Sequence, residues 1–295
     1  MLLLAVLLFG DSSHVVQLAV SPQESVSVTV AGAGAGEPVV LVPGLFGSAF
    51  GYRHLIPLLV GAGYQAIVFE PLGVGTSARP ERADYSLSAQ AERLATVLDT
   101  LHVRQAVIIG HDIGAAIAFR LAYRRPDLVR AIVSLEGGPA EAAATPGFRR
   151  AMRFAPWIKM FGGYGRVRRE IRRSLVASSG DTSWVSDAVV DGYTTGAAHN
   201  FDGTLKAYVR MAHAREPERL VPHLAEILCP VRLVVGSAPH SGGIPAAEVR
   251  VLAARLPAFT VDTVSGAGHF LYEEQPQAVF AAIERAETAP ARPPK

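Results

Sequence analysis

The sequence predicts an α/β fold with a mostly parallel, doubly wound sheet and an inserted helical cap. Short apolar, β-branched runs alternate with helical patterns along most of the 295 residues, as is typical of parallel sheets with right-handed crossovers. The alternation stops over about residues 139–222, where helical patterns continue without a convincing strand. One apolar run, 106–111, passes directly into a helical pattern through Gly110-His111-Asp112-Ile113-Gly114. Such a sharp turn needs small flanking residues, because the strand and helix backbones approach closely.

The first half of the core begins with residues 26–30, where valines alternate with Ser and Thr. The Gly/Ala turn 31–36 then predicts a hairpin-like connection to the apolar strand 38–42. A helix is expected over 52–62, a strand over 66–70 and a second helix over 86–101. Ser86 or Ser88 is the expected cap of that second helix. The strand and elbow around Asp112 follow.

The second half continues with a strand over 131–136, which Gly137-Gly138-Pro139 ends. After the helical insertion, strands are expected over 231–235 and 259–264, and an amphipathic helix over 275–286. We therefore divide the chain into four parts. They are an apolar N-terminal segment and lead-in (1–24), a core (25–138 and 223–288), a helical cap (139–222) and a disordered tail (289–295).

Composition limits the possible partners and location. The net charge of +2 gives no reason to expect nucleic acid, and the single Cys229 excludes an intrachain disulfide and fits no metal cluster. Residues 1–9 are almost wholly apolar, too few to span a bilayer but enough for the core of a signal peptide. We expect export slightly ahead of a cytoplasmic location, in which residues 1–10 would pack on the domain.

Four segments, in this order, resemble the α/β-hydrolase fold. They are Val42-Pro43-Gly44-Leu45-Phe46-Gly47-Ser48, Glu70-Pro71-Leu72-Gly73-Val74-Gly75-Thr76-Ser77, Gly110-His111-Asp112-Ile113-Gly114, and Gly266-Ala267-Gly268-His269-Phe270 with Glu273 and Pro276. Within that fold the elbow resembles those of epoxide hydrolases and haloalkane dehalogenases, which use an aspartate nucleophile. The resemblance implies that Asp112 fills this role.

The chemistry of these side chains agrees with the resemblance. A carboxylate is nucleophilic at neutral pH without a base, so Asp112 could attack an sp³ carbon and form an alkyl-enzyme ester. His269 in the late loop could then activate the water that cleaves this ester. The backbone N–H groups of Leu45 and Ile113 are the expected oxyanion hole. We expect neither a metal nor a cofactor. His111 precedes the turn residue and is expected to point back into the fold.

The acid that would orient His269 is not at its usual place. In much of the fold it follows the strand here spelled 231–235, but Pro239 occupies that position. Some haloalkane dehalogenases hold their acid after the preceding core strand, where this chain has Glu136. We favour Glu136 as the acid, because a carboxylate at the end of an apolar strand is costly to bury without a partner. The competing interpretation is that Glu136 only bonds the turn at Gly137-Gly138.

The substrate is less well defined than the nucleophile. Dehalogenases bind the leaving halide with side-chain N–H donors at the positions that here hold Ile113 and Leu45, whose side chains donate nothing. Epoxide opening needs an acid for the leaving alkoxide, which epoxide hydrolases supply from cap tyrosines, although their His-Gly-x-Pro oxyanion motif is missing here. The expected pocket residues, including three candidate tyrosines, are Phe46, Trp157, Tyr164, Tyr193 and Tyr208.

Residues 149–173 carry nine basic side chains and a single acid, Glu170, interleaved with apolar residues. This pattern predicts an amphipathic element whose apolar face covers the pocket and whose basic face meets water. Contact with an anionic membrane surface or steering of an anionic substrate are the alternatives. A hydrophobic small-molecule substrate is expected, with the protein a monomer or homodimer.

Epoxide hydrolysis is the first functional expectation and haloalkane hydrolysis the second. Ester or lactone hydrolysis, with His269 as a general base and no covalent step, is the third. A non-catalytic, ligand-binding member of the fold is the alternative outside enzymes.

Overall fold

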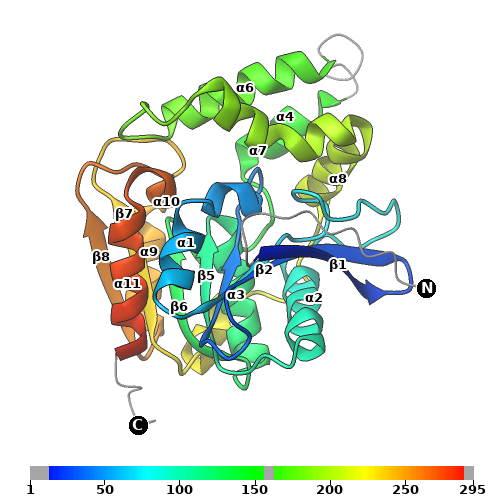
Figure 1. Cartoon of the computed structure of the whole chain (residues 1–295). Coiled ribbons are helices and arrows are strands. Elements are labelled where there is room, and N and C mark those ends of the chain that lie inside the picture. Colours follow the sequence, from blue (N-terminus) through cyan, green and yellow to red (C-terminus); the bar gives the residue numbers. More distant parts are fainter. Residues whose placement is uncertain (1–12, 156–162, 289–295) are drawn as a thin grey trace.

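The computed structural model describes residues 13–155 and 163–288 (Figure 1). Three of the features predicted from the sequence lie outside the described residues: the apolar segment 1–10, Trp157 and the tail 289–295. The expectations made for them stay predictions. Within the described ranges, no helix combines the length and the apolar character that crossing a bilayer requires.

Eight strands form one sheet in the order β1-β2-β4-β3-β5-β6-β7-β8. Strand β2 is antiparallel to both β1 and β4, and all other neighbours are parallel. This arrangement confirms the predicted fold class. The strands are β1 (Ser13–Ser21), β2 (Glu24–Ala31), β3 (Pro38–Val42), β4 (Gln65–Phe69), β5 (Ala106–His111), β6 (Val129–Leu135), β7 (Val231–Gly236) and β8 (Phe259–Val264).

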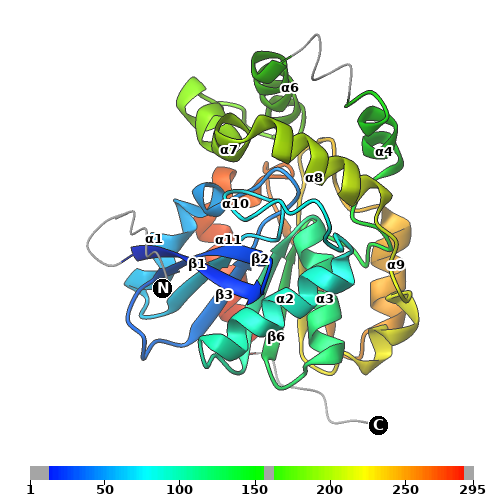
Figure 2. The ribbon, with the colours of Figure 1, turned by 90° about the vertical axis from the view of Figure 1, so that its right-hand side faces the viewer.

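Helices cover both faces of the sheet, because alternate strand residues point to opposite sides. On β3, Val40 and Val42 join the cluster of α2 and α3, whereas Val39 and Leu41 join that of α1 and α11. Figure 2 shows α2 and α3 on one side of the sheet. The core helices are η2 (Ala49–Tyr52), α1 (Leu55–Gly61), α2 (Leu87–Thr100), α3 (Ile113–Arg124), η3 (Val221–Glu226), α9 (Ala246–Arg255), α10 (Leu271–Glu274) and α11 (Pro276–Thr288). Ser86 caps α2 as expected, accepting a bond from Ala89.

The hairpin predicted between residues 26–30 and 38–42 is wrong. Strand β2 pairs instead with β1, in a register that joins Val28 to Val16, and with β4 on its other side. Residues 13–21, expected to be a lead-in, supply the missing strand. Val16, Leu18 and Val20 recur at every second position, which is a strand pattern, and all three pack against the core.

The stretch between β6 and β7 forms helices and contains no strand among its described residues. We call α4 (Pro146–Met152), α6 (Gly163–Ala177), α7 (Asp187–His199) and α8 (Phe201–His213) the helical insert. It lies above the sheet, over the ends of its strands, in both views (Figures 1 and 2). The phenol of Tyr208 on α8 donates to the carbonyl of Leu45, which follows β3, at 2.9 Å. The insert therefore meets the core beside the carboxyl ends of the strands.

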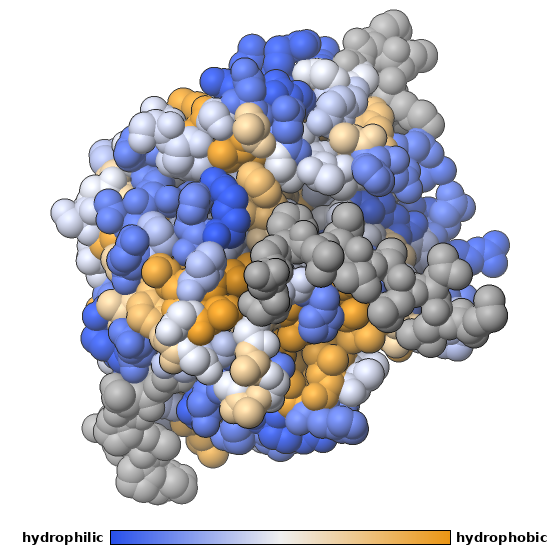
Figure 3. Space-filling view, viewed as in Figure 1, coloured by the Kyte–Doolittle hydropathy of each residue, from blue (hydrophilic) through white to orange (hydrophobic). Residues whose placement is uncertain are grey.

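Helix α6 is amphipathic, as residues 149–173 predicted. Ile171 and Leu175 are buried, and the outer face over α6 is hydrophilic (Figure 3). Arg168 pairs with Asp187 and Asp191 of α7, at 3.1 and 2.6 Å. The basic face of α6 is thus partly neutralised by the neighbouring helix.

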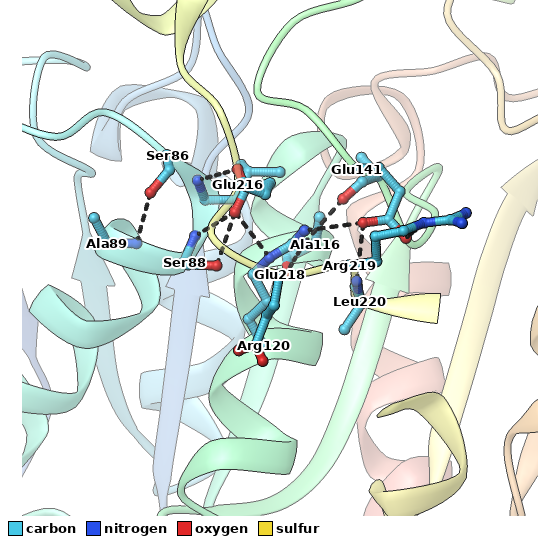
Figure 4. A network of polar contacts seen from close by, with 12 residues as sticks. Ser86, Ser88, Ala89, Ala116, Arg120, Glu141, Glu216, Glu218, Arg219 and Leu220 are labelled. Carbon is cyan, nitrogen blue, oxygen red and sulfur yellow. Dashed lines mark hydrogen bonds and ion pairs between the residues drawn. The ribbon is translucent and has the colours of Figure 1, made fainter. Parts of the chain in front are cut away.

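A buried arginine joins the core to the segment that returns from the insert (Figure 4). Arg120 of α3 is 1% exposed and donates to the carbonyl of Ala140 at 2.9 Å. Its guanidinium lies 3.3 Å from the carboxylate of Glu216. That carboxylate also accepts bonds from the N–H groups of Leu87 and Ser88 at the start of α2, where a negative charge is favoured. The two ends of the insert are therefore fixed to α2 and α3.

Candidate active site

Asp112 lies at the elbow between β5 and α3, with backbone angles φ 52° and ψ −119°. A non-glycine residue with positive φ is unusual and marks local strain. The flanking glycines are required by close approach. A Cβ at Gly110 would lie 2.5 Å from the backbone of Ala115, and one at Gly114 would lie 2.2 Å from the carbonyl oxygen of Val42. The sequence thus forces the Asp112 side chain away from the sheet.

The carboxylate of Asp112 faces two backbone donors. Burial raises its pKa to about 6, and hydrogen bonds from the N–H groups of Ile113 and Leu45 oppose that rise. These are the two groups expected to form the oxyanion hole. Because its pKa is about 6, the Asp112 carboxyl is ionised at neutral pH.

His269 follows β8 and is 8% exposed. Its backbone N–H donates to the carbonyl of Ser178 at 2.7 Å, and its own carbonyl lies 3.1 Å from Nε2 of His111. Burial, with smaller effects of His111 and His240, holds the pKa of His269 well below its usual value. The imidazole is therefore neutral near pH 7, the form that a general base requires. His111 points into the fold, as expected.

Glu136 follows β6 with φ 51°, another strained non-glycine residue. Its carboxylate accepts bonds from the N–H groups of Gly236 and Ile244, at 2.5 and 3.3 Å. Burial raises the pKa of Glu136. A carboxylate oxygen lies within 4.8 Å of a His269 ring nitrogen, but His269 Nδ1 has no hydrogen-bond partner within the described ranges. The two side chains are therefore neighbours without a direct bond.

His240 is a site residue that the sequence did not indicate. Nδ1 lies 2.7 Å from the carbonyl of Ala238 and must donate to it, because a carbonyl only accepts. Nε2 lies 3.6 Å from Glu136 Oε1. Pro239 occupies the position where the fold usually holds its acid, and His240 follows it directly. This adjacency is the signal in the sequence that could have indicated His240 as a site residue.

A cavity of about 780 Å³ lies between the helical insert and the core. Its wall beside Leu45 is formed by Phe46, Phe148 and Tyr208. The centroid of the Phe46 ring lies 5.8 Å from that of Phe148 and 5.3 Å from that of Tyr208. Tyr193 also lines the cavity. Tyr164 is not among the described lining residues, and its phenol bonds the hydroxyl of Thr194 at 2.9 Å. Of the three candidate tyrosines, two therefore reach this space.

Asp112 and His269 are not among the described lining residues of this cavity. Leu45 provides the link, since its N–H faces Asp112 while its carbonyl accepts the phenol of Tyr208 from the cavity wall. A ligand in the cavity would therefore lie next to the oxyanion loop.

Tyr272, near the start of α10, is a second residue that the sequence did not indicate. Its phenol lies 3.4 Å from His111 Nδ1. Burial raises the pKa of Tyr272, and the nearby charges of Glu273 and Asp112 add to this rise. Tyr193 donates to Glu273 at 2.8 Å, which in turn pairs with Arg53 at 2.5 Å. Glu273 and Arg53 therefore join Tyr193 of the helical insert to the core.

Comparison with known proteins supports this fold. Residues 37–170 match the model of the alpha/beta hydrolase fold family. The uncharacterized hydrolase YugF of Bacillus subtilis is 26% identical over 82% of this chain and 87% of its own length. Bifunctional epoxide hydrolase 2 of Sus scrofa is 39% identical, over 35% of this chain and only 19% of its own.

A solved structure extends the likeness to nearly the whole chain. The epoxide hydrolase CorEH, without ligand, superposes with a TM-score of 0.76 over 92% of this chain and 98% of its own, at 20% identity. That identity shows the fold alone. Together with the family match over residues 37–170 and the similarity to the YugF hydrolase, it shows that the chain has the α/β-hydrolase fold.

Proposed function

We propose that the protein hydrolyses epoxides of hydrophobic small molecules through an ester on Asp112. The observation that carries this proposal is the Asp112 carboxylate on a strained elbow, facing the N–H groups of Leu45 and Ile113. A serine at this position would indicate acyl transfer, whereas a carboxylate can attack an sp³ carbon directly and become alkylated. The named epoxide hydrolases among the similar proteins support the same substrate class.

In the first step an Asp112 oxygen attacks a ring carbon and the carbon–oxygen bond of the epoxide breaks. The leaving alkoxide takes a proton from a phenol, for which Tyr193 and Tyr208 are the candidates because both line the cavity. The product is a hydroxyalkyl ester of Asp112. We propose that the helical insert acts as the cap that brings these phenols and the substrate together.

In the second step neutral His269 removes a proton from water, and the hydroxide adds to the ester carbon of Asp112. Two backbone N–H groups then stabilise the oxyanion, each worth about 3 kcal/mol in comparable sites. The carbon–oxygen bond to the substrate breaks, its oxygen takes the proton from His269, and the diol leaves. The proton of the resulting Asp112 carboxylic acid then returns to the phenolate formed in the first step, which restores both groups. Glu136 is proposed to stabilise the imidazolium, since its carboxylate lies within 4.8 Å of the ring.

Haloalkane hydrolysis would use the same ester but needs donors for the halide. Leu45 and Ile113 offer only backbone N–H groups, which already face the Asp112 carboxylate. Their side chains are aliphatic, so epoxide opening fits the described site better. Ester hydrolysis without a covalent step would leave the Asp112 carboxylate without a use at the elbow.

The test is intact-mass analysis of a His269→Gln variant mixed with styrene oxide or with 1-bromohexane. This variant should form the ester but not cleave it, so its mass should increase by that of styrene oxide. The matched Asp112→Ala, His269→Gln double variant should show no increase. Adducts with the bromide alone would assign dehalogenation instead. The covalent proposal is wrong if neither reagent leaves an adduct that depends on Asp112.

A further inference from the structure

Glu136, His240 and His269 converge from three loops at the ends of β6, β7 and β8. One ligand-type atom from each lies within 4.8 Å of the other two. The cluster is enclosed, since His269 is 8% exposed and the His240 and Glu136 side chains are 8% and 2% exposed. We call these three residues the Glu-His-His cluster. Two imidazoles and a carboxylate are a common ligand set for Zn²⁺.

Two buried ring nitrogens in this cluster lack a hydrogen-bond partner within the described ranges. They are His240 Nε2 and His269 Nδ1. The Nδ1–H of His240 is used by the carbonyl of Ala238, so in the neutral ring Nε2 is a lone pair. This lone pair lies 3.6 Å from an oxygen of Glu136. Two acceptors facing one another in a buried site require a shared proton or a cation between them.

The adjacent glycines leave space at this point. A Cβ at Gly243 would lie 2.9 Å from His240 Nε2 and 3.4 Å from Glu136 Oε2, and one at Gly242 would lie 3.4 Å from His269 Nδ1. Coordination at about 2.0–2.2 Å would need only a modest contraction of atoms that now lie within 4.8 Å of one another. We propose that the Glu-His-His cluster is a reversible inhibitory site for a divalent transition metal of the Zn²⁺ class.

Metal binding would remove two groups from the hydrolytic step. A protonated His269 could no longer form beside the Glu136 carboxylate, because both side chains would be ligands of a cation. This inference rests on the proposed function. It predicts that the metal-bound protein still forms the ester of Asp112 but no longer cleaves it. Its accumulation would resemble that in the His269→Gln variant. Chelation would restore turnover, because no covalent bond is made by the metal.

Binding is tested without any substrate, by titrating Co²⁺ into the full chain and recording its visible absorption and the heat of binding. We expect one ion per chain, with the intense absorption of a four- or five-coordinate site. His240→Gln removes one nitrogen ligand and should weaken binding at least about 10-fold. His213→Gln, at an exposed histidine on α8, should bind as the wild type does.

A second variant, Gly243→Ala, keeps all three ligands but fills the space between them, and should also weaken binding. Gly243→Ala still tests metal binding at the cluster if the His240→Gln variant does not fold. The site is refuted if the wild type binds no stoichiometric Co²⁺, or if both variants bind as tightly as His213→Gln. Such outcomes would leave the proposed epoxide chemistry unaffected.

The inhibitory role is tested with Zn²⁺ and styrene oxide. Intact mass should show the Asp112 adduct in wild-type protein with Zn²⁺, and its loss after EDTA is added. Stoichiometric Zn²⁺ binding with unchanged turnover would overturn the inhibitory role. Absence of any adduct, in the His269→Gln variant as well, would instead count against the proposed function.

Discussion

The ionised carboxylate of Asp112 should lower the stability of the folded protein, and Asp112→Asn tests this. Burial raises the pKa of Asp112 from 3.8 to about 6. A difference of about 2.2 pKa units, at 1.36 kcal/mol each, corresponds to about 3 kcal/mol of native-state destabilisation when the group is charged. Asparagine keeps the size of the side chain and carries no charge. The variant should therefore be more stable than the wild type at neutral pH.

The sign of the pH dependence follows from the raised pKa. Below pH 3.8 the carboxyl binds its proton in both the folded and unfolded states, so the cost is absent. Above about pH 6 both states are ionised and the cost is complete. Linkage then gives a gain for Asp112→Asn of about 3 kcal/mol at pH 7.5 and about 1 kcal/mol at pH 4.5.

Urea unfolding at these two pH values measures the difference. The control is Asp84→Asn, at an exposed aspartate whose Oδ1 accepts a bond from the Ser86 N–H at 2.8 Å. An asparagine there can accept the same bond, so the control variant should be about as stable as the wild type. The electrostatic reasoning is refuted if Asp112→Asn matches the wild type at pH 7.5. It is equally refuted if the gain is the same at both pH values.

Three further predictions concern the reaction and the fold. Because the pKa of Asp112 is about 6, its alkylation in the trapping variant should slow about 10-fold from pH 7 to pH 5; single-turnover mass analysis would expose a flat profile as a contradiction. Tyr193→Phe or Tyr208→Phe should slow alkylation about 10²–10⁴-fold, and Tyr164→Phe should not; wild-type rates in both cavity variants would exclude these phenols. Arg120→Met should lower the free energy of unfolding by about 3–5 kcal/mol, because it leaves a buried carboxylate uncompensated; a loss below about 1 kcal/mol would disprove that role.

The elements closest to Asp112 were predictable because their signals are local. An apolar β-branched run, a glycine on each side of the turn residue and an Ala-rich helix are contained within about fifteen residues. Close packing of Gly110 and Gly114 against the neighbouring backbone is the physical cause of that pattern. The Ser86 cap is likewise visible in the sequence, because its side chain accepts a bond from a residue three positions later.

Features that depend on distant partners were not predictable in the same way. Strand β1 gains its place from pairing with β2, and the expected hairpin ignored this competition. His240 comes near Glu136 only because β6 and β7 are adjacent and parallel. The three candidate tyrosines looked equivalent in sequence, whereas only Tyr193 and Tyr208 line the cavity.

The environments of Asp112 and His269 shift their pKa values in complementary ways for a two-step reaction. Burial raises the pKa of Asp112 only to about 6, because the N–H groups of Ile113 and Leu45 stabilise the anion. Burial lowers the pKa of His269, and no acceptor at Nδ1 compensates for it among the described residues. Above about pH 6 the chain therefore holds the proposed nucleophile in its charged form and the proposed base in its neutral form. A negatively charged group bonded to His269 would raise the pKa of its imidazole. The pH range in which Asp112 is charged and His269 neutral would then begin at a higher pH. The missing bond between His269 and Glu136 thus favours a neutral imidazole in the resting protein, and the role proposed for the Glu136 carboxylate begins only when the imidazolium forms.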